Sequence, residues 1–153
     1  LAIDAEGNLP EAGWEKLNTA DAIIFGTPTY MGGPSWQFKK FADASSKAWF
    51  TRAWQDKVFG AFTNSASPVG DKGATLAQLQ TLASQHGGIW VSLGLLPANG
   101  KAATHADINH LGGSVGLLVR SPSDAAVDEI PQGDLDTAKR YGQRIAEVAL
   151  RLN

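Results

Sequence analysis

Ala22-Ile23-Ile24-Phe25-Gly26, followed directly by the Gly- and Pro-rich stretch Thr27–Pro34, decides the fold class of this 153-residue chain. A short continuous apolar run is typical of a strand that is buried on both faces, as in a parallel sheet. Ser35 then provides a suitable N-cap for a helix that continues to about residue 46. The stretch therefore predicts a strand, a loop and a helix in succession.

The same alternation continues to the end of the chain. Further strands are predicted at residues 57–62, 89–93 and 115–119, and further helices at residues 11–20, at 74–86 and from a cap at Asp134 to Leu152. Strands that alternate with helices indicate a parallel sheet covered on both faces. No linker, repeat or low-complexity stretch interrupts this pattern. We therefore expect an α/β fold with a doubly wound parallel sheet in a three-layer α/β/α arrangement, forming a single domain over residues 1–153.

The predicted order of elements has a gap at its front. A doubly wound sheet of this type needs about five strands, whereas the sequence predicts four. The chain opens without a first strand that would run into a glycine- or hydroxyl-rich loop. We therefore expect that the sheet lacks its first strand and helix in this chain.

Composition excludes several classes of function. The net charge of −2 is too small to suggest nucleic acid or an anionic membrane as a partner. The absence of cysteine excludes disulfides, thiol catalysis and thiolate metal sites, and it is compatible with the cytoplasm. No segment approaches the ~18 apolar residues of a membrane span. Residues 1–10 include acidic residues and no basic one, unlike a signal peptide.

Two polar loops are the best candidates for a binding site. Residues 27–33 and 63–72 each follow a predicted strand, and ligands of open α/β sheets bind beyond the carboxyl ends of the strands. Both loops offer backbone N–H groups and small side chains, with no evident acid–base pair. Such walls suit a flat aromatic ligand with several acceptor atoms, such as a flavin. The alternative is that both loops are ordinary connections between strands and helices.

Other chemical motifs are absent or weak. The sequence has no P-loop, no G-x-G-x-x-G and no G-x-S-x-G, and Gly70-Asp71-Lys72-Gly73 has the wrong order for a P-loop. The spacing of His105 and His110 is poor for a shared metal ion, so no metal site is predicted. His86 ends a predicted helix, where the helix dipole also favours a purely structural histidine.

Several motifs together resemble one family. Residues 21–29, DAIIFGTPT, are similar to a signature of the WrbA family, the FMN-dependent NAD(P)H:quinone oxidoreductases of flavodoxin-like fold. The similarity extends over essentially the whole chain through residues 37–43, 86–88, 111–114 and 138–142. The chain departs from the family at Pro68 and Val69, where the family has glycines, and at Tyr30, where it usually has arginine.

The resemblance implies a set of site residues. It places FMN against two loops and one histidine, namely Pro28, Thr29, Tyr30, Met31, Gly32, Asn64, Ser65, Ala66, Ser67, Pro68, Val69, Gly70 and His86. It also implies His86 as the catalytic residue and Trp49 as the quinone-binding residue. The family's phosphate-binding loop has no counterpart here, so the resemblance implies no phosphate contacts.

The function that follows is transfer of two electrons from NADH or NADPH, through FMN, to a quinone in the cytoplasm. Flavin chemistry explains the lack of an acid–base pair, because the cofactor performs the difficult step. The resemblance also implies a homo-oligomer, a dimer or a tetramer, and the tryptophan-rich residues 36–54 are the candidate interface. Two alternatives stay open. One is a flavodoxin-type electron carrier, which a net charge of −2 disfavours. The other is an interaction module that has lost its cofactor.

Overall fold

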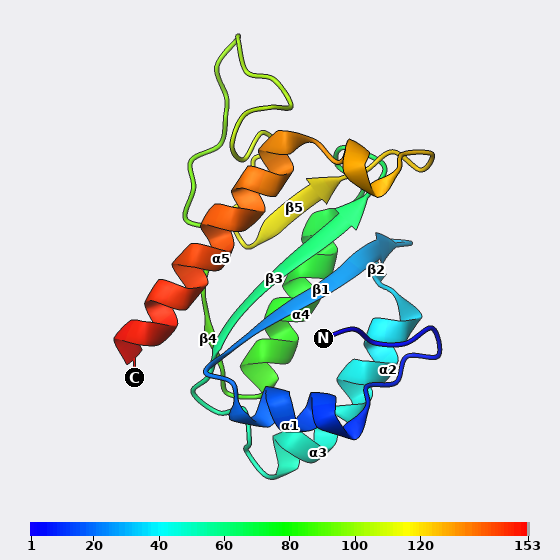
Figure 1. The fold of residues 1–153 in the computed structure, drawn as a ribbon, viewed down its shortest axis with the longest axis vertical. Helices are drawn as coiled ribbons and strands as arrows, with labels where there is room; N and C mark the ends of the chain where they lie inside the picture. The colour runs from blue at the N-terminus through cyan, green and yellow to red at the C-terminus, as the bar shows by residue number, and fades with distance from the viewer. Residues whose placement is uncertain (153) are drawn as a thin grey trace.

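A sheet of mainly parallel strands forms the centre of the computed structural model, which describes residues 1–152 (Figure 1). In chain order the elements are α1 (Glu11–Thr19), β1 (Ala22–Tyr30), β2 (Gly33–Pro34), α2 (Trp36–Ala44), α3 (Ser46–Phe50), β3 (Val58–Ser65), α4 (Lys72–Gln85), β4 (Ile89–Trp90), β5 (Leu117–Arg120), a 3-10 turn (Val127–Glu129) and α5 (Gln132–Leu152). Every predicted strand and helix is present, although several differ in length. The α/β class is confirmed.

β1 is longer than the sequence predicted. Its parallel register with β3 continues to the pair Pro28–Asn64, and its last residues pair with the short antiparallel strand β2. The prediction of a loop from residue 27 is therefore wrong for residues 27–30, which are strand. The turn itself is only Met31-Gly32, and both residues have positive φ angles, 50° and 76°.

β4 and β5 share one edge of β3. β4 pairs with Val58 and Phe59 near the start of β3, whereas β5 pairs with residues 62–65 near its end. Between β4 and β5 the chain makes a long excursion away from the sheet (Figure 1). The predicted strand at 89–93 is therefore shortened to Ile89–Trp90. β4 and β5 lie one after the other along the same side of β3.

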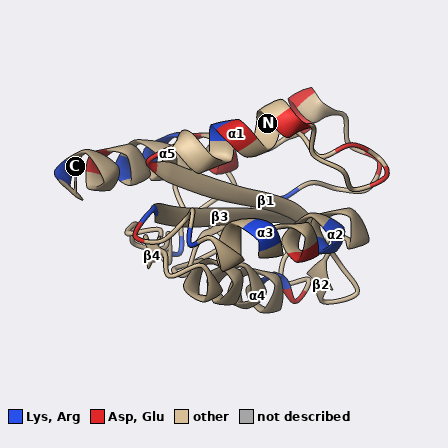
Figure 2. Ribbon diagram, turned by 90° about the horizontal axis from the view of Figure 1, so that it is seen from below, with Lys and Arg blue, Asp and Glu red and all other residues tan. Residues whose placement is uncertain are grey.

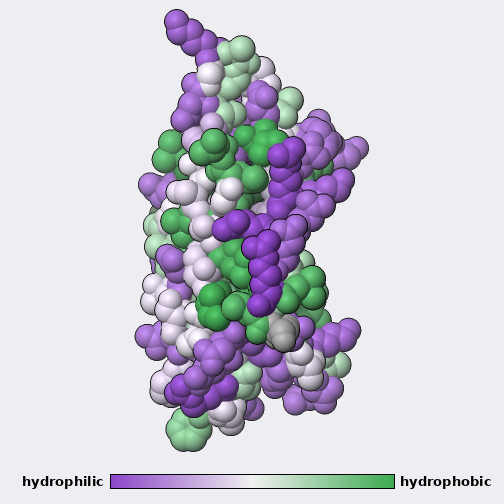
Figure 3. All heavy atoms as spheres, turned by 90° about the vertical axis from the view of Figure 1, so that its left-hand side faces the viewer, coloured by the Kyte–Doolittle hydropathy of each residue, from purple (hydrophilic) through white to green (hydrophobic). Residues whose placement is uncertain are grey.

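Helices cover both faces of the sheet, as the three-layer prediction requires. α2, α3 and α4 lie on one face and α5 lies on the other (Figure 2). The α4 face packs around Phe25, Phe59 and Leu76, while the α5 face packs around Tyr141 and Ile145. Basic and acidic residues are interspersed along the helices in Figure 2 and form no block of one sign on this face. On another face, apolar atoms lie between the polar side chains near the end of α5 (Figure 3).

Ser35 and Asp134 were both predicted as helix N-caps, and only Ser35 has this role in the structure. Ser35 Oγ accepts a hydrogen bond from Phe38 N at 3.3 Å and so caps α2, as expected. Asp134 lies inside the first turn of α5, and its carboxylate accepts from the backbone N–H of Arg120 at 2.8 Å. The prediction that Asp134 caps the last helix is therefore wrong, because this carboxylate joins α5 to β5 instead.

Replacing Gly60, which lies where β3 packs against α5, tests this packing directly. A Cβ at this position would lie 2.7 Å from the hydroxyl of Tyr141 and would also meet Ile145. We expect Gly60→Ala to lower the free energy of unfolding by about 1–3 kcal/mol, the usual cost of overpacking a core. Gly142→Ala on α5 is the matched control, because a Cβ there meets nothing within 4 Å.

Urea unfolding of both variants provides the measurement. Since alanine is a better helix former than glycine by up to about 1 kcal/mol, Gly142→Ala should unfold at equal or higher urea concentration than the wild type. A Gly60→Ala midpoint equal to that of the wild type would show that α5 does not pack on β3 in this way.

Candidate functional site

The carboxyl ends of β1, β3 and β5 meet at one edge of the sheet, shown at the upper right in Figure 1. This is the edge where open α/β sheets bind their ligands. It brings together the turn after β1, at Met31-Gly32, and the loop after β3, at residues 66–71. The expectation that the two polar loops lie side by side is met, since residues 28 and 64 are register partners.

The loop after β3 presents unsatisfied polar groups. Ala66, Ser67, Pro68 and Val69 are exposed, and Val69 is 80% exposed. Within residues 1–152, the backbone N–H groups of Ala66, Ser67 and Val69 find no hydrogen-bond acceptor. The side-chain oxygen of Asn64 is buried, and no described residue donates to it. Buried polar atoms normally have a partner, so this donor and acceptor set is suited to a bound polar ligand.

The residues at the end of β1 divide between the two faces of the strand. Tyr30 is 65% exposed and Met31 is fully exposed, so both side chains are available to a ligand. Thr29 is buried, and its hydroxyl bonds to those of Thr63 at 2.7 Å and Thr75 at 2.8 Å. Of the residues predicted to contact a cofactor here, Thr29 therefore has its side chain engaged within the protein.

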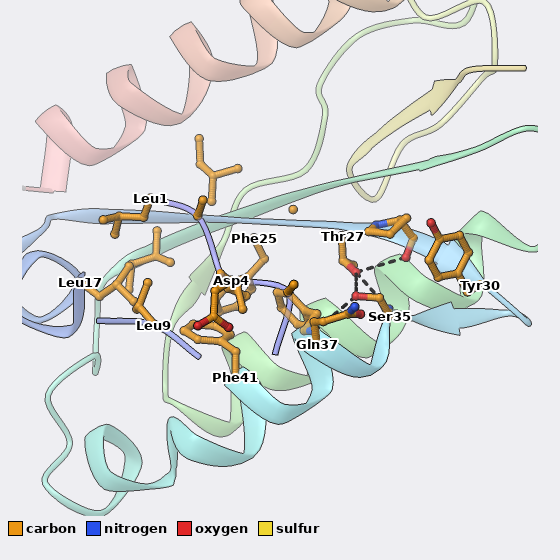
Figure 4. Close-up of a pocket in the computed structure, with 18 residues that line it drawn as sticks. Leu1, Asp4, Leu9, Leu17, Phe25, Thr27, Tyr30, Ser35, Gln37 and Phe41 are labelled. Atoms are coloured by element: carbon orange, nitrogen blue, oxygen red, sulfur yellow. Dashed lines mark hydrogen bonds between the residues drawn. The ribbon is translucent and has the colours of Figure 1, made fainter. Parts of the chain in front are cut away.

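A cleft of about 470 Å³ runs along the free edge of β1 up to this site (Figure 4). Its walls come from β1, α2 and the N-terminal residues 1–5. Thr27 and Ser35 lie at its carboxyl end, where Ser35 N donates to Thr27 Oγ1 at 3.1 Å. Tyr30 stands beside them in Figure 4. The cleft thus opens onto the same edge as the two loops.

His86 and Trp49 lie at the opposite end of the sheet. His86 follows the last residue of α4, and the next carbonyl, that of Gly87, accepts from Asp56 N just before β3 begins. Trp49 lies on α3 at the same end, where both residues line a cleft of about 320 Å³. Because α4 runs antiparallel to β3, its last turn is carried away from the carboxyl edge. Within a single chain, His86 and Trp49 therefore do not join the two loops in one pocket, and the roles predicted for them stay predictions that need a second copy of the chain.

The side chain of His86 is buried and makes contacts within the protein. It is 5% exposed, its ring lies 4.4 Å from that of Trp54, and its Nε2 bonds to Ser45 Oγ at 2.9 Å. Burial lowers the pKa of His86 below its usual value of 6.5, because the charged imidazolium is poorly solvated there. These contacts agree with the structural role that the helix-terminal position allows.

The lowered pKa predicts a pH dependence of stability. The unfolded chain binds the His86 proton more readily than the folded protein, so stability is fully present above about pH 6.5 and decreases as the pH falls below it. In His86→Gln this contribution is removed, so the difference in unfolding free energy between pH 8 and pH 5 should be smaller than in the wild type. Urea titrations at the two pH values measure it, and equal differences would show that the pKa of His86 is the same in the folded and the unfolded protein.

A buried charged cluster lies beneath the carboxyl edge, and sequence reasoning missed it. Lys72 is fully buried, and its Nζ donates to Ser65 Oγ at 2.8 Å. Asp134 Oδ1 lies 3.3 Å from His110 Nδ1. Burial raises the pKa of Asp134, although the hydrogen bond from the Arg120 backbone acts in the opposite direction. A lysine that follows a polar loop containing Gly70 was the available signal, but the sequence alone does not show that it is buried.

Neither a metal site nor a membrane span is found in the part of the chain that the structure describes. Residues 1–152 contain no group of three or more histidine and acidic side chains arranged to hold a metal ion. None of the helices within these residues combines the length and the apolar character that crossing a bilayer requires.

A family model described as NADPH-dependent FMN reductase matches residues 7–122. The chain belongs to this family. The match covers both candidate loops and every strand of the sheet. The FMN reductase family is an oxidoreductase family, so this membership sets the general class of the protein.

Individual relatives narrow the placement within the FMN reductase family. The chain is 63% identical to "Flavodoxin FldP" of Pseudomonas aeruginosa over all 153 residues, which cover 83% of that protein. It is 37% identical over 139 residues to an "NAD(P)H dehydrogenase (quinone)" of Archaeoglobus fulgidus, covering 90% of this chain and 64% of that protein. The crystal structure of a "flavodoxin, WrbA-like protein" from Agrobacterium tumefaciens is similar, with TM-score 0.78 and 56% identity, covering 99% of this chain and 80% of that chain. The resemblance to the WrbA family and the flavodoxin-like fold are thereby confirmed.

Proposed function

We propose that this chain binds FMN at the carboxyl edge of its sheet and transfers two electrons from NADH or NADPH to a quinone. The observation that carries this proposal is the pairing of two features at one edge. Tyr30 and Met31 present exposed side chains there, and the loop after β3 presents amides without acceptors beside them.

The residues at this edge fit the isoalloxazine ring of FMN. The ring has acceptor atoms along its N5, O4, N1 and O2 edges and one donor at N3. The free amides of Ala66, Ser67 and Val69 supply donors, and the buried Asn64 side-chain oxygen supplies an acceptor that lacks a donor within residues 1–152. Bound FMN would supply the hydride and electron transfer that no side chain of this protein performs.

The chain's own residues would bind and orient the cofactor. Tyr30 offers an aromatic face for stacking, and Met31 is free to cover part of the ring. Gly32 and Gly70 have positive φ angles that allow the two loops to turn close to a ligand. Pro28 and Pro68 complete the walls, while the Ser65 side chain is engaged with Lys72. The nicotinamide and the quinone would use the exposed face of the ring in turn.

The relatives support this choice of substrates. The Archaeoglobus fulgidus protein carries the name of a quinone-reducing NAD(P)H dehydrogenase, and the family carries the name of an NADPH-dependent reductase. The absence of an acid–base pair among the residues of the edge agrees with hydride chemistry, which needs orientation more than proton transfer. A cysteine-free chain that uses a nicotinamide donor also suits the cytoplasm.

His86 and Trp49 can contribute to such a site only from another copy of the chain, and we propose that the protein is a homo-oligomer. Trp49 is 50% exposed and Phe50 is 82% exposed, next to each other on α3. Large exposed aromatic side chains of this kind are typical of interfaces. We expect light scattering at micromolar concentration to report a dimer or a tetramer and Phe50→Asp to shift the protein toward the monomer. A monomeric wild type would rule out both the interface and a role for His86 or Trp49 in the site.

A flavodoxin-type electron carrier is the second candidate. It is favoured by one specific observation, the 63% identity to a protein named a flavodoxin. A carrier would bind FMN equally well but would exchange electrons with protein partners and would not oxidise NADH or NADPH directly. The net charge of −2 gives little electrostatic attraction to a basic partner.

Anaerobic reduction separates these functions. The enzyme should bleach its flavin absorbance within seconds of adding NADH or NADPH, and a quinone should restore it. Flavin that binds but stays oxidised with both nicotinamides would support the carrier. Failure to bind FMN would leave the interaction module.

A further inference from the structure

Lys72 is the least expected buried residue of the molecule. It is the first residue of α4, and its exposed fraction is 0%. Lysine is rarely buried completely without a partner, because desolvation of the ammonium is costly. Burial accordingly lowers the pKa of Lys72, and the negative charge of Asp134 opposes that effect. The burial of Lys72 therefore requires specific contacts that compensate the lost hydration of its ammonium.

The hydrogen bonds of the Lys72 ammonium go to Ser65, the last residue of β3, and to Ser67 in the loop that follows it. Its Nζ donates to Ser65 Oγ at 2.8 Å, to the carbonyl oxygen of Ser65 at 3.5 Å and to the carbonyl oxygen of Ser67. An ammonium has three N–H donors, so this short segment satisfies it. Lys72 thus fastens the loop from beneath, while Ser121 N donates to the Ser65 carbonyl from β5's side.

These hydrogen bonds from Lys72 to Ser65 and Ser67, here called the clamp, determine which way the peptide groups of the loop point. A peptide unit is planar and trans, so its C=O and the following N–H point in opposite directions. Because the Ser65 carbonyl turns inward to Lys72, the N–H of Ala66 turns away from it. Within the described residues, that N–H has no acceptor. The same contacts that bury the lysine therefore present a donor at the carboxyl edge.

The clamp also places a positive charge under the loop. Arg120 lies close enough to depress the pKa of Lys72 further, and its Nε donates to the carbonyl oxygen of Ala66 at 3.3 Å. Asp134 is the carboxylate that faces this pair, and it is also shared with His110. Two basic side chains therefore hold the loop, against one carboxylate.

We propose that Lys72 is a positioning residue for the flavin: it fixes the loop of residues 65–67 so that its amides face the ring, and its charge favours the reduced, more electron-rich form. This inference rests on the proposed function and deepens it. It assigns to one buried side chain both the affinity for FMN and part of the midpoint potential. Lys72 touches neither the cofactor nor a substrate.

Lys72→Met tests both parts, because methionine has a similar length and no charge. We expect the dissociation constant for FMN to increase at least tenfold, measured by quenching of FMN fluorescence. We also expect the reduced flavin to lose about tenfold more affinity than the oxidised flavin. For a two-electron couple, this corresponds to a midpoint potential lower by about 30 mV, measured by equilibration with a reference dye. Lys139→Met on the exposed surface of α5 is the charge-matched control and should leave both values unchanged.

Ser65→Ala separates positioning from charge and covers the case in which Lys72→Met does not fold. It removes the one side-chain acceptor that Lys72 has among the described residues but keeps the ammonium. FMN affinity should therefore fall about two- to fivefold while the potential stays the same. A folded Lys72→Met with wild-type affinity and potential would overturn the inference, as would an unchanged affinity in Ser65→Ala. Wild-type protein that binds no FMN would instead refute the proposed function.

Discussion

Gly70→Ala is expected to weaken FMN binding about tenfold or more while leaving the protein folded. Gly70 has a φ angle of +52°, which a residue with a Cβ adopts only at a cost of about 1–2 kcal/mol. A Cβ at this position would also collide with Ser65 Oγ, which Lys72 holds in place, and would lie 3.1 Å from the Ser67 carbonyl. The loop must shift to relieve these contacts, and the shift moves the amides proposed to bind the flavin.

Gly73→Ala is the matched control for that loop. Gly73 lies three residues further along in α4, and a Cβ there meets nothing within 4 Å. The control should bind FMN like the wild type. Fluorescence titration with FMN and thermal unfolding of the apo-proteins measure the two effects separately. If folded Gly70→Ala binds FMN as tightly as Gly73→Ala does, the loop after β3 is not part of the cofactor site.

Tyr30→Ala is expected to reduce FMN affinity about tenfold, with a similar loss in the rate of quinone reduction at limiting FMN. The side chain is 65% exposed at the end of β1, so its removal leaves no cavity and the fold should be unaffected. What it removes is an aromatic face for stacking, and the loss of contact area and stacking together is about 1–2 kcal/mol. A stability change larger than the binding change would argue against this interpretation.

Phe50→Ala provides the contrast at the other end of the sheet. Phe50 is a similarly exposed aromatic residue, 82% exposed, but it lies on α3, away from the two loops. Its replacement should mainly affect assembly and should lower FMN affinity less than Tyr30→Ala does. Equal losses of affinity in Tyr30→Ala and Phe50→Ala would mean that the proposed edge has no special role.

The fold class could be predicted from the sequence because it depends on local patterns. Buried strands, the Ser35 cap and the apolar spacing of the helices are each encoded within a few residues, and all appear in the structure. The lengths of β1 and β4 could not be predicted in the same way. The ends of these strands depend on pairing with β3, which is distant in the sequence, and on the antiparallel strand β2, which has only two residues.

The candidate site was predicted in part for the same reason. The two loops follow strands that are neighbours in the sheet, so their meeting follows from the α/β pattern itself. His86 could not be placed this way, because a histidine at the end of a helix is carried to the far end of the sheet whenever that helix runs antiparallel to the strands. The resemblance implied both this residue and an oligomer, and within one chain the structure keeps His86 away from the two loops.

Lys72 shows what neither pattern nor resemblance reveals. Its hydrogen bonds go to Ser65 and Ser67, a few residues before it, but the charged groups near it, Arg120 and Asp134, come from β5 and α5. No local rule predicts that a lysine at the start of a helix will turn under the preceding loop. Buried charges of this kind depend on tertiary contacts and have to be read from the structure.

The most direct test of the central claim is the visible spectrum of the protein after incubation with FMN and desalting, followed by anaerobic addition of NADPH and then of a quinone. The account predicts a bound flavin spectrum that NADPH bleaches and the quinone restores, with Gly73→Ala behaving as the wild type and Gly70→Ala losing most of its flavin during desalting. A desalted wild-type protein without flavin absorbance would contradict it.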